Sequence, residues 1–90
     1  MKETYYDILE VSEKASNEII KKAYNVFVKK YHPDVVSEDK KAWAEENMKR
    51  INEAYETLID PQKRKEYDEN LASIREQENK LKYENYSNTR

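Results

Sequence analysis

The tripeptide His32-Pro33-Asp34 places two polar side chains on either side of a proline. Because the proline ring restricts the backbone, His32 and Asp34 have less conformational entropy to lose when they bind a partner. The segment that leads into the tripeptide carries four lysines, which predict a basic surface beside the histidine–aspartate corner: Lys21, Lys22, Lys29 and Lys30. Taken alone, the same residues also fit an ordinary helix stop surrounded by solvated lysines.

Catalysis is not expected from these residues. His32 and Asp34 could serve as a general base and the group that orients it, but no serine has a recognisable nucleophile setting. A single histidine and the lack of cysteine exclude zinc sites built on histidine or thiolate ligands. The lack of glycine excludes glycine-rich phosphate loops and dinucleotide fingerprints. We therefore expect no enzyme activity, no metal and no cofactor.

The charge balance gives no general attraction to nucleic acid or to an anionic membrane. The 90 residues include 17 basic and 19 acidic side chains, and the net charge is −2. No apolar run approaches membrane-spanning length, and the opening segment MKETYYDILE lacks the apolar centre of a secretory signal. We expect a monomeric, intracellular and cytoplasmic domain without nucleic-acid or membrane contacts.

Two long segments have apolar residues at helical spacing. The first is expected to begin after an N-cap at Ser16 and to stop at Pro33, which lacks a backbone donor. The second begins at about Lys41 and ends before Asp60, the expected cap of a short fourth helix. The apolar positions are Ile20, Ala23, Tyr24, Phe27, Val28 and Tyr31 in the first segment, and Ala44, Met48, Ile51, Tyr55 and Leu58 in the second, widened by Trp43, Ala54 and Ile59.

An antiparallel hairpin of the two long helices buries both apolar stripes most simply, so the sequence predicts an all-α fold. A short helix capped by Thr4 precedes the hairpin, and without glycine its exit is expected to be loose. The predicted domain covers residues 3–68. Residues 69–90 are predicted to form a polar helical extension that frays or is disordered at its end.

A minor apolar stripe on the first long helix, Ile19 and Val26, has two possible explanations. It could pack against Leu71, Ile74 and Leu81 of the extension or against a partner. It could equally consist of scattered exposed residues, which are common on protein surfaces.

Four blocks of the sequence, in order, resemble the J domain of the DnaJ family. Tyr5-Tyr6-Asp7-Ile8-Leu9 resembles its first helix, and Ile20 to Tyr24 followed by Lys30 to Asp34 resembles its second helix and HPD signature. Ile51 to Leu58 resembles its third helix. Asp60 to Asp68, with the sequence Gln-Lys-Arg, resembles its fourth. The resemblance implies a four-helix J-domain fold, in which helices one and four pack around the hairpin of helices two and three.

The resemblance also implies a function. J domains are co-chaperones of DnaK-type seventy-kilodalton heat-shock chaperones, and they stimulate the partner's ATP hydrolysis without an active site of their own. By this resemblance His32, Pro33 and Asp34 would contact the chaperone together with the lysines of helix two. Arg64 is a secondary candidate, either for holding the loop or for touching the partner.

The sequence departs from the family pattern at several positions. Asn25 and Val26 replace two residues that are usually basic, which predicts weaker or more selective docking. Glu10 stands where glycine commonly ends the first helix. Ile19 replaces a glutamate that would complete a capping box on Ser16, and Met48 replaces a frequent phenylalanine.

Two other functions stay open at this point. The chain could be a J-like scaffold that binds a protein without stimulating an ATPase. It could also be a small helical domain that binds nucleic acid through the four lysines, although the acidic residues of the later helices weigh against this alternative.

Overall fold

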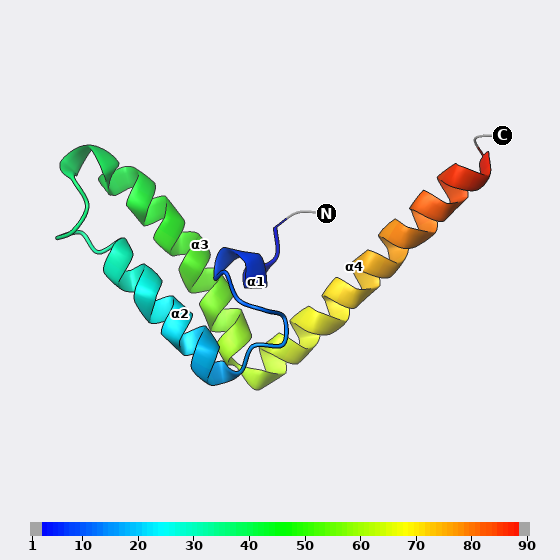
Figure 1. Cartoon of the computed structure of the whole chain (residues 1–90), viewed down its shortest axis with the longest axis horizontal. Coiled ribbons are helices and arrows are strands. Elements are labelled where there is room, and N and C mark those ends of the chain that lie inside the picture. The colour runs from blue at the N-terminus through cyan, green and yellow to red at the C-terminus, as the bar shows by residue number, and fades with distance from the viewer. Residues whose placement is uncertain (1–2, 89–90) are drawn as a thin grey trace.

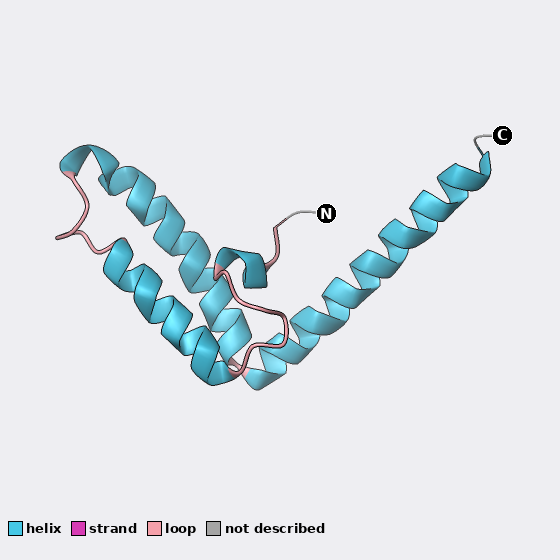
Figure 2. Cartoon of the chain, in the orientation of Figure 1, coloured by secondary structure: helices cyan, strands magenta, loops and turns pink. Residues whose placement is uncertain are grey.

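The computed structural model describes residues 3–88, with side chains described through residue 82, and this part of the chain contains helices and no strand (Figure 2). The helices are α1 (Tyr5–Ile8), α2 (Asn17–Lys30), the 3-10 helix η1 (Glu38–Lys40), α3 (Lys41–Ile59) and α4 (Pro61–Asn88). In Figure 1, α2 and α3 lie side by side as an antiparallel hairpin, α1 lies against α3, and α4 projects away from the hairpin. The predicted all-α, four-helix fold is confirmed.

The predicted helix starts agree with the hydrogen bonds in the structure. Ser16 Oγ accepts the backbone N–H of Ile19 at 3.3 Å, and Thr4 forms a reciprocal capping box with Asp7. Asp60 Oδ1 accepts the N–H groups of Gln62 and Lys63 at 2.9 and 3.1 Å. Each oxygen satisfies a backbone donor that the first turn of a helix leaves without a partner.

The core lies between α2 and α3 and is closed by α1 and the first turns of α4. Its large, fully buried side chains are Tyr6, Leu9, Ile20 and Leu58, each exposed by no more than 1%. Three tyrosines of the predicted apolar stripes lie at the edge of the core and are only half-buried: Tyr24, Tyr31 and Tyr55. Because a tyrosine ring is apolar and its hydroxyl is polar, these edge positions suit both ends of the side chain.

One expectation about the C-terminal part of the chain is corrected. The fourth helix is not short: α4 is one continuous helix of 28 residues. No proline or glycine follows Pro61 in this segment, and Lys, Glu, Gln and Leu favour helix propagation. The helix therefore shows no break at residue 68, and Thr89 and Arg90, at the end predicted to fray, lie outside the described residues.

The apolar stripe of α2 does not pack on the extension. Within the described residues, α4 packs against α3 and not against α2. Ile19 is 48% exposed and Val26 is 61% exposed. Of the three apolar residues of the extension, only Leu71 joins the core, because Ile74 and Leu81 lie farther along the projecting helix.

The exit of α1 is tight rather than loose. The N–H of Glu10 donates to the carbonyl of Asp7, and the N–H of Val11 donates to the carbonyl of Tyr6, both at 3.0 Å. This pair of bonds is a Schellman motif, which needs a residue in the left-handed region at its turning point. Glu10 takes that conformation, with φ of 56°. A side chain with a Cβ atom is strained there, which explains why glycine is preferred at such positions.

Replacing Glu10 with glycine should therefore stabilise the fold. We expect Glu10→Gly to raise the free energy of unfolding by about 1 kcal/mol. The substitution relieves the strain of a left-handed residue, and this gain exceeds the loss from the greater conformational entropy that glycine gives to the unfolded chain. Urea unfolding followed by circular dichroism measures the change. Glu10→Ala removes the same charge but keeps the Cβ atom, so it should give no comparable gain. An equal gain in both variants would assign the effect to charge and contradict the strain.

Candidate functional site

The His32-Pro33-Asp34 segment forms a closed turn at the end of the hairpin; we call it the tip. The helix α2 ends at Lys30, and the carbonyl of His32 then accepts the N–H groups of Val35 at 2.9 Å and Val36 at 3.2 Å. Pro33 occupies the second position of this turn, where its fixed φ is already suited to the geometry. The turn holds the flanking side chains in place without burying them.

Both polar side chains of the tip face solvent. The backbone N–H of Asp34 donates to His32 Nδ1 at 3.2 Å, and an Asp34 carboxylate oxygen lies 3.7 Å from the same nitrogen. The side chains are 51% exposed for His32 and 90% exposed for Asp34. With Nδ1 used as an acceptor, Nε2–H remains as an outward donor beside an outward carboxylate. This arrangement suits recognition of another molecule's surface rather than chemistry in a closed pocket.

Aromatic rings support the tip from the hairpin side. The Tyr31 ring stacks on Phe27 with centroids 6.3 Å apart, and Trp43 meets Tyr31 edge-on at 5.3 Å. Further along the hairpin, Tyr24 stacks on Tyr55 at 4.0 Å. These contacts tie α2 to the start of α3 and fix the base of the turn.

Trp43 is more exposed than the apolar pattern predicts. The pattern places it in the buried stripe of the third helix, but the residue is 55% exposed. Trp43 precedes the buried Ala44, and a step of one residue turns a helix by 100°, so its ring lies at the margin of the stripe. The single tryptophan therefore forms part of the surface beside the tip.

The lysines of α2 differ in how they are engaged. All four are exposed. Lys22 pairs with Glu18 at 3.4 Å, and Lys30 Nζ lies 5.6 Å from the centre of the Tyr31 ring. Among the described residues, neither Lys21 nor Lys29 takes part in an ion pair.

Asn25 and Val26 also lie on the exposed surface of α2. Residues three and four apart are neighbours on a helix, so both lie between the lysines of the preceding and following turns. The two departures from the family pattern therefore interrupt the basic surface itself.

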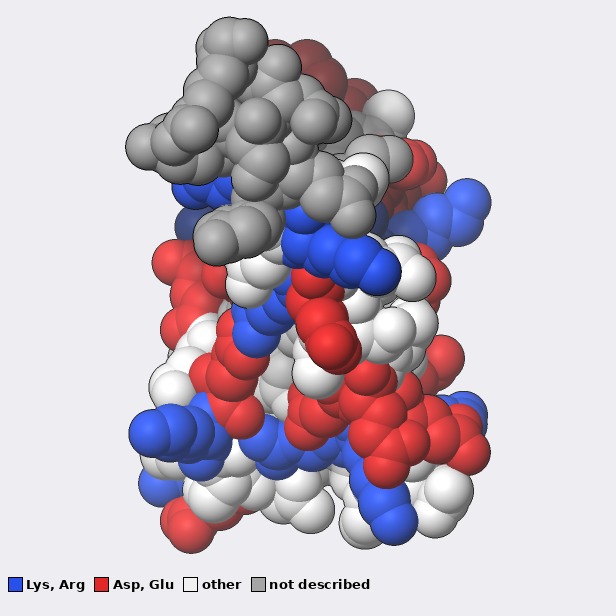
Figure 3. Space-filling view, turned by 90° about the vertical axis from the view of Figure 1, so that its right-hand side faces the viewer, with Lys and Arg blue, Asp and Glu red and all other residues white. Residues whose placement is uncertain are grey.

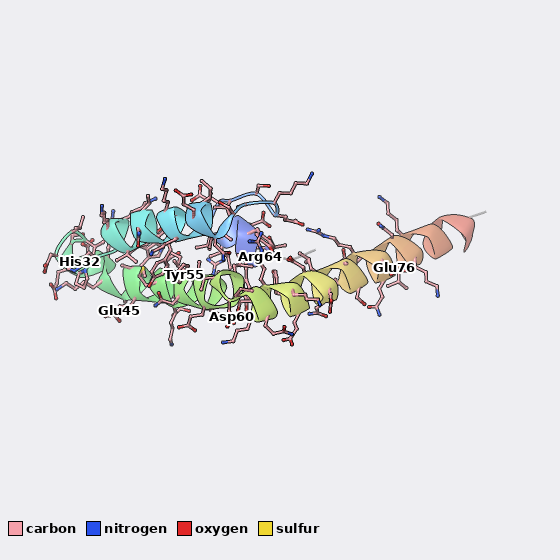
Figure 4. All side chains as sticks on the ribbon, turned by 90° about the horizontal axis from the view of Figure 1, so that it is seen from below. His32, Glu45, Tyr55, Asp60, Arg64 and Glu76 are labelled. Atoms are coloured by element: carbon pink, nitrogen blue, oxygen red, sulfur yellow. The ribbon has the colours of Figure 1, made fainter. Side chains whose placement is uncertain are left out.

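Arg64 lies away from the tip. Figure 4 shows His32 at one end of the hairpin, with Arg64 and Asp60 at the other end, where α4 begins. The Arg64 side chain is 18% exposed; its Nε donates to the hydroxyl of Tyr6, and its Nη2 donates to the carbonyl of Glu13, both at 3.1 Å. Burial, together with donation of the hydroxyl proton to Asp68, raises the pKa of Tyr6 to about 12. Arg64 thus holds the loop between α1 and α2, not the tip.

Neither a metal site nor a membrane span is found in the part of the chain that the structure describes. Over residues 3–82, whose side chains are described, no group of three or more histidine, cysteine, aspartate or glutamate residues is placed to hold a metal ion. None of the described helices combines the length and the apolar character needed to cross a membrane.

Known proteins with similar sequences match most of this chain. Residues 4–68 match the family model of the DnaJ domain. The chain is 57% identical over 67 residues to "Chaperone protein DnaJ 2" of Aquifex aeolicus, and 53% identical over 68 residues to "Chaperone protein DnaJ" of Listeria monocytogenes. It is 58% identical over 65 residues to "Chaperone protein DnaJ" of Limosilactobacillus reuteri.

These matches concern one part of each relative. They cover 74%, 76% and 72% of this chain, but only 17%, 17% and 16% of the three relatives. The matched part contains the whole α2–α3 hairpin and the tip. By the family match, the order of its helices and the HPD turn between α2 and α3, the chain belongs to the DnaJ domain family.

Proposed function

We propose that this chain is a co-chaperone module that binds a DnaK-type seventy-kilodalton heat-shock chaperone and stimulates its ATP hydrolysis. The observation that carries the proposal is the exposed, backbone-locked tip of a DnaJ-family hairpin. The chemistry of ATP hydrolysis belongs to the partner, and this chain supplies a binding surface without a catalytic group or a cofactor. We expect the interaction to occur in the cytoplasm.

The tip supplies the directional contacts of the proposed complex. The Asp34 carboxylate is the proposed acceptor for a basic side chain of the chaperone, in a charge-assisted hydrogen bond. His32 offers its outward N–H as a donor. Since the turn already fixes both residues, little ordering remains to oppose binding.

The lysines of α2 supply long-range attraction. An acidic chaperone surface would be steered toward Lys21 and Lys29 first, because Lys22 is paired with Glu18 and Lys30 lies against Tyr31. Asn25 and Val26 reduce the charge between these lysines. The proposed docking is therefore weaker, or more selective for its partner, than docking through an uninterrupted basic surface.

Nucleic-acid binding is less well supported than protein binding. Figure 3 shows the side of the molecule that faces right in Figure 1, and there the basic and acidic side chains are interspersed. The basic surface of α2 is short and is interrupted by Val26. A continuous basic stripe, which nucleic-acid binding usually requires, is missing from both described surfaces.

Substitution of His32 should strongly reduce stimulation while leaving the fold intact. In single-turnover ATP hydrolysis by a DnaK-type chaperone, we expect the chain to raise the rate and His32→Gln to reduce the stimulation by at least about tenfold. This loss corresponds to one hydrogen bond at a desolvated contact. Lys65→Gln changes an exposed residue of α4 at the opposite end of the hairpin and should stimulate normally.

The result separates the three candidate functions. Binding of the unaltered chain without any stimulation would contradict the proposal and favour the scaffold. Salt-sensitive binding to nucleic acid that His32→Gln does not change would also contradict it. Circular dichroism of His32→Gln checks that the fold survives, as the exposure of the side chain leads us to expect.

Restoring charge on α2 should strengthen docking. We expect Asn25→Lys combined with Val26→Lys to raise the affinity for the chaperone several-fold and to steepen its salt dependence, because both positions lie among the docking lysines. Calorimetric titration at two ionic strengths measures both effects.

A matched control places the same two charges elsewhere. Ala72 and Ser73 are exposed on α4, and replacing both with lysine gives the same net charge away from the tip. The control pair should leave affinity nearly unchanged. If the two lysines on α2 did not change the affinity, or if the two lysines on α4 raised it equally, then Asn25 and Val26 would not weaken docking.

A further inference from the structure

Among the described residues, the hydrogen bonds from α4 to the loop between α1 and α2 all go to one residue, Glu13. Arg75 Nη1 donates to Glu13 Oε1 at 2.8 Å, and Arg75 Nη2 donates to the other carboxylate oxygen. The main chain of the same residue is also bound, because Arg64 donates to the Glu13 carbonyl. Two arginines of α4, about three helical turns apart, thus bind one loop residue through both its side chain and its backbone.

Of the two arginines that bind Glu13, Arg75 lies beyond the part of the chain that matches the DnaJ domain. That match ends at residue 68, whereas Leu71 is only 6% exposed and Arg75 lies one turn further along α4. We call residues 69–82 the arm. In Figure 4, the labelled Glu76 marks the arm on the far side of Arg64 from His32, so the arm points away from the tip.

We propose that Glu13 and Arg75 form an electrostatic latch that fixes the arm to the loop between α1 and α2 and so sets the direction of the arm relative to the tip. Among the described side chains, the latch is the last hydrogen-bonded ion pair that joins α4 to the rest of the fold. Residues 76–82 form no hydrogen bond or ion pair with the rest of the described fold and do not join the core, and a short helix without such packing is marginal in water.

The geometry distinguishes the latch from an ordinary surface ion pair. Most exposed pairs contribute little, because two long side chains must be ordered for one contact in water. Here the guanidinium meets the carboxylate with two hydrogen bonds, the strong form of this contact, and both side chains are about half-buried. Arg75 also holds the pKa of Glu13 below its usual range, as a stabilised carboxylate requires.

The latch also restrains the approach to the docking helix. Glu13 lies between Glu10, the left-handed residue, and Ser16, the N-cap of α2. The same loop is closed by the bond from the Ala15 N–H to the Ser12 carbonyl at 3.0 Å. Opening the latch should therefore loosen this loop turn as well as the arm, and the two effects should appear together.

Distances between two spin labels test the latch directly. The chain has no cysteine, so Lys40→Cys near the tip and Lys80→Cys on the arm, both exposed, give two unique attachment sites. For the doubly labelled chain we expect a single narrow distance distribution. When Arg75→Gln is added, we expect a broader distribution, because the fraction of molecules in which the arm is detached from the loop becomes several-fold larger. Raising the salt concentration from about 0.01 M to about 1 M shortens the Debye length from about 30 Å to about 3 Å. This change should broaden the distribution of the chain that keeps Arg75 and leave that of the Arg75→Gln variant nearly unchanged.

Arg50→Gln is the matched control. Arg50 pairs with Glu3 at a similar exposure, but neither residue belongs to the arm or to the loop. The control should keep the narrow distribution. Hydrogen exchange of the Ala15 amide should accelerate several-fold in Arg75→Gln and stay unchanged in Arg50→Gln. A distribution that is already broad in the unaltered chain, one that Arg75→Gln does not widen, or equal effects of both variants would overturn the latch.

Discussion

The tip depends on the antiparallel packing of α2 against α3. Ile20 and Phe27 from one helix meet Ile51 and Leu58 from the other, and all four side chains are buried. Full burial of a side chain of this kind contributes about 1.5–3 kcal/mol, so these few residues supply much of what a domain of this size can gain. A turn between two loosely packed helices would not hold His32 and Asp34 in one arrangement.

Polar contacts add to the stability that the small core provides. The tyrosines place their rings against the core and use their hydroxyls for long-range bonds, as Tyr24 does with Asn52 at 2.8 Å. Tyr67 stacks on Tyr5 and accepts the Tyr5 N–H, which ties α4 to α1. The high charge of the chain likewise has structural uses, since Arg64 and Arg75 of α4 both bind Glu13. The net charge of −2 conceals these specific pairings.

Local patterns were sufficient to predict much of this structure. Helical spacing gave the hairpin, and the caps at Ser16 and Asp60 followed from residue type and position. The family pattern identified Glu10 as unusual, although the tightness of its turn was not foreseen, because a Schellman motif without glycine contradicts residue preference. The tip corresponds to the His32-Pro33-Asp34 motif, whereas the hydrogen bonds that close its turn are seen only in the structure.

Contacts between distant residues could not be predicted in the same way. Glu13 and Arg75 are 62 positions apart, and nothing in either local sequence indicates that they meet. Arg64 was considered for the partner surface, but its bonds to Tyr6 and Glu13 exist only once α4 lies beside α1. The exposure of Trp43 depends on where the edge of the core falls, which spacing alone defines only to within a residue.

The central claim is that the tip and the lysine-bearing surface of α2 form one docking surface for a DnaK-type chaperone. Amide chemical shifts of the labelled chain, recorded while the ATP-bound chaperone is added, test this claim most directly. The account predicts saturable changes concentrated in residues 21–34, with Trp43 affected and α4 beyond residue 68 unaffected. Changes concentrated on α4, or no changes at chaperone concentrations that stimulate hydrolysis in related pairs, would contradict it.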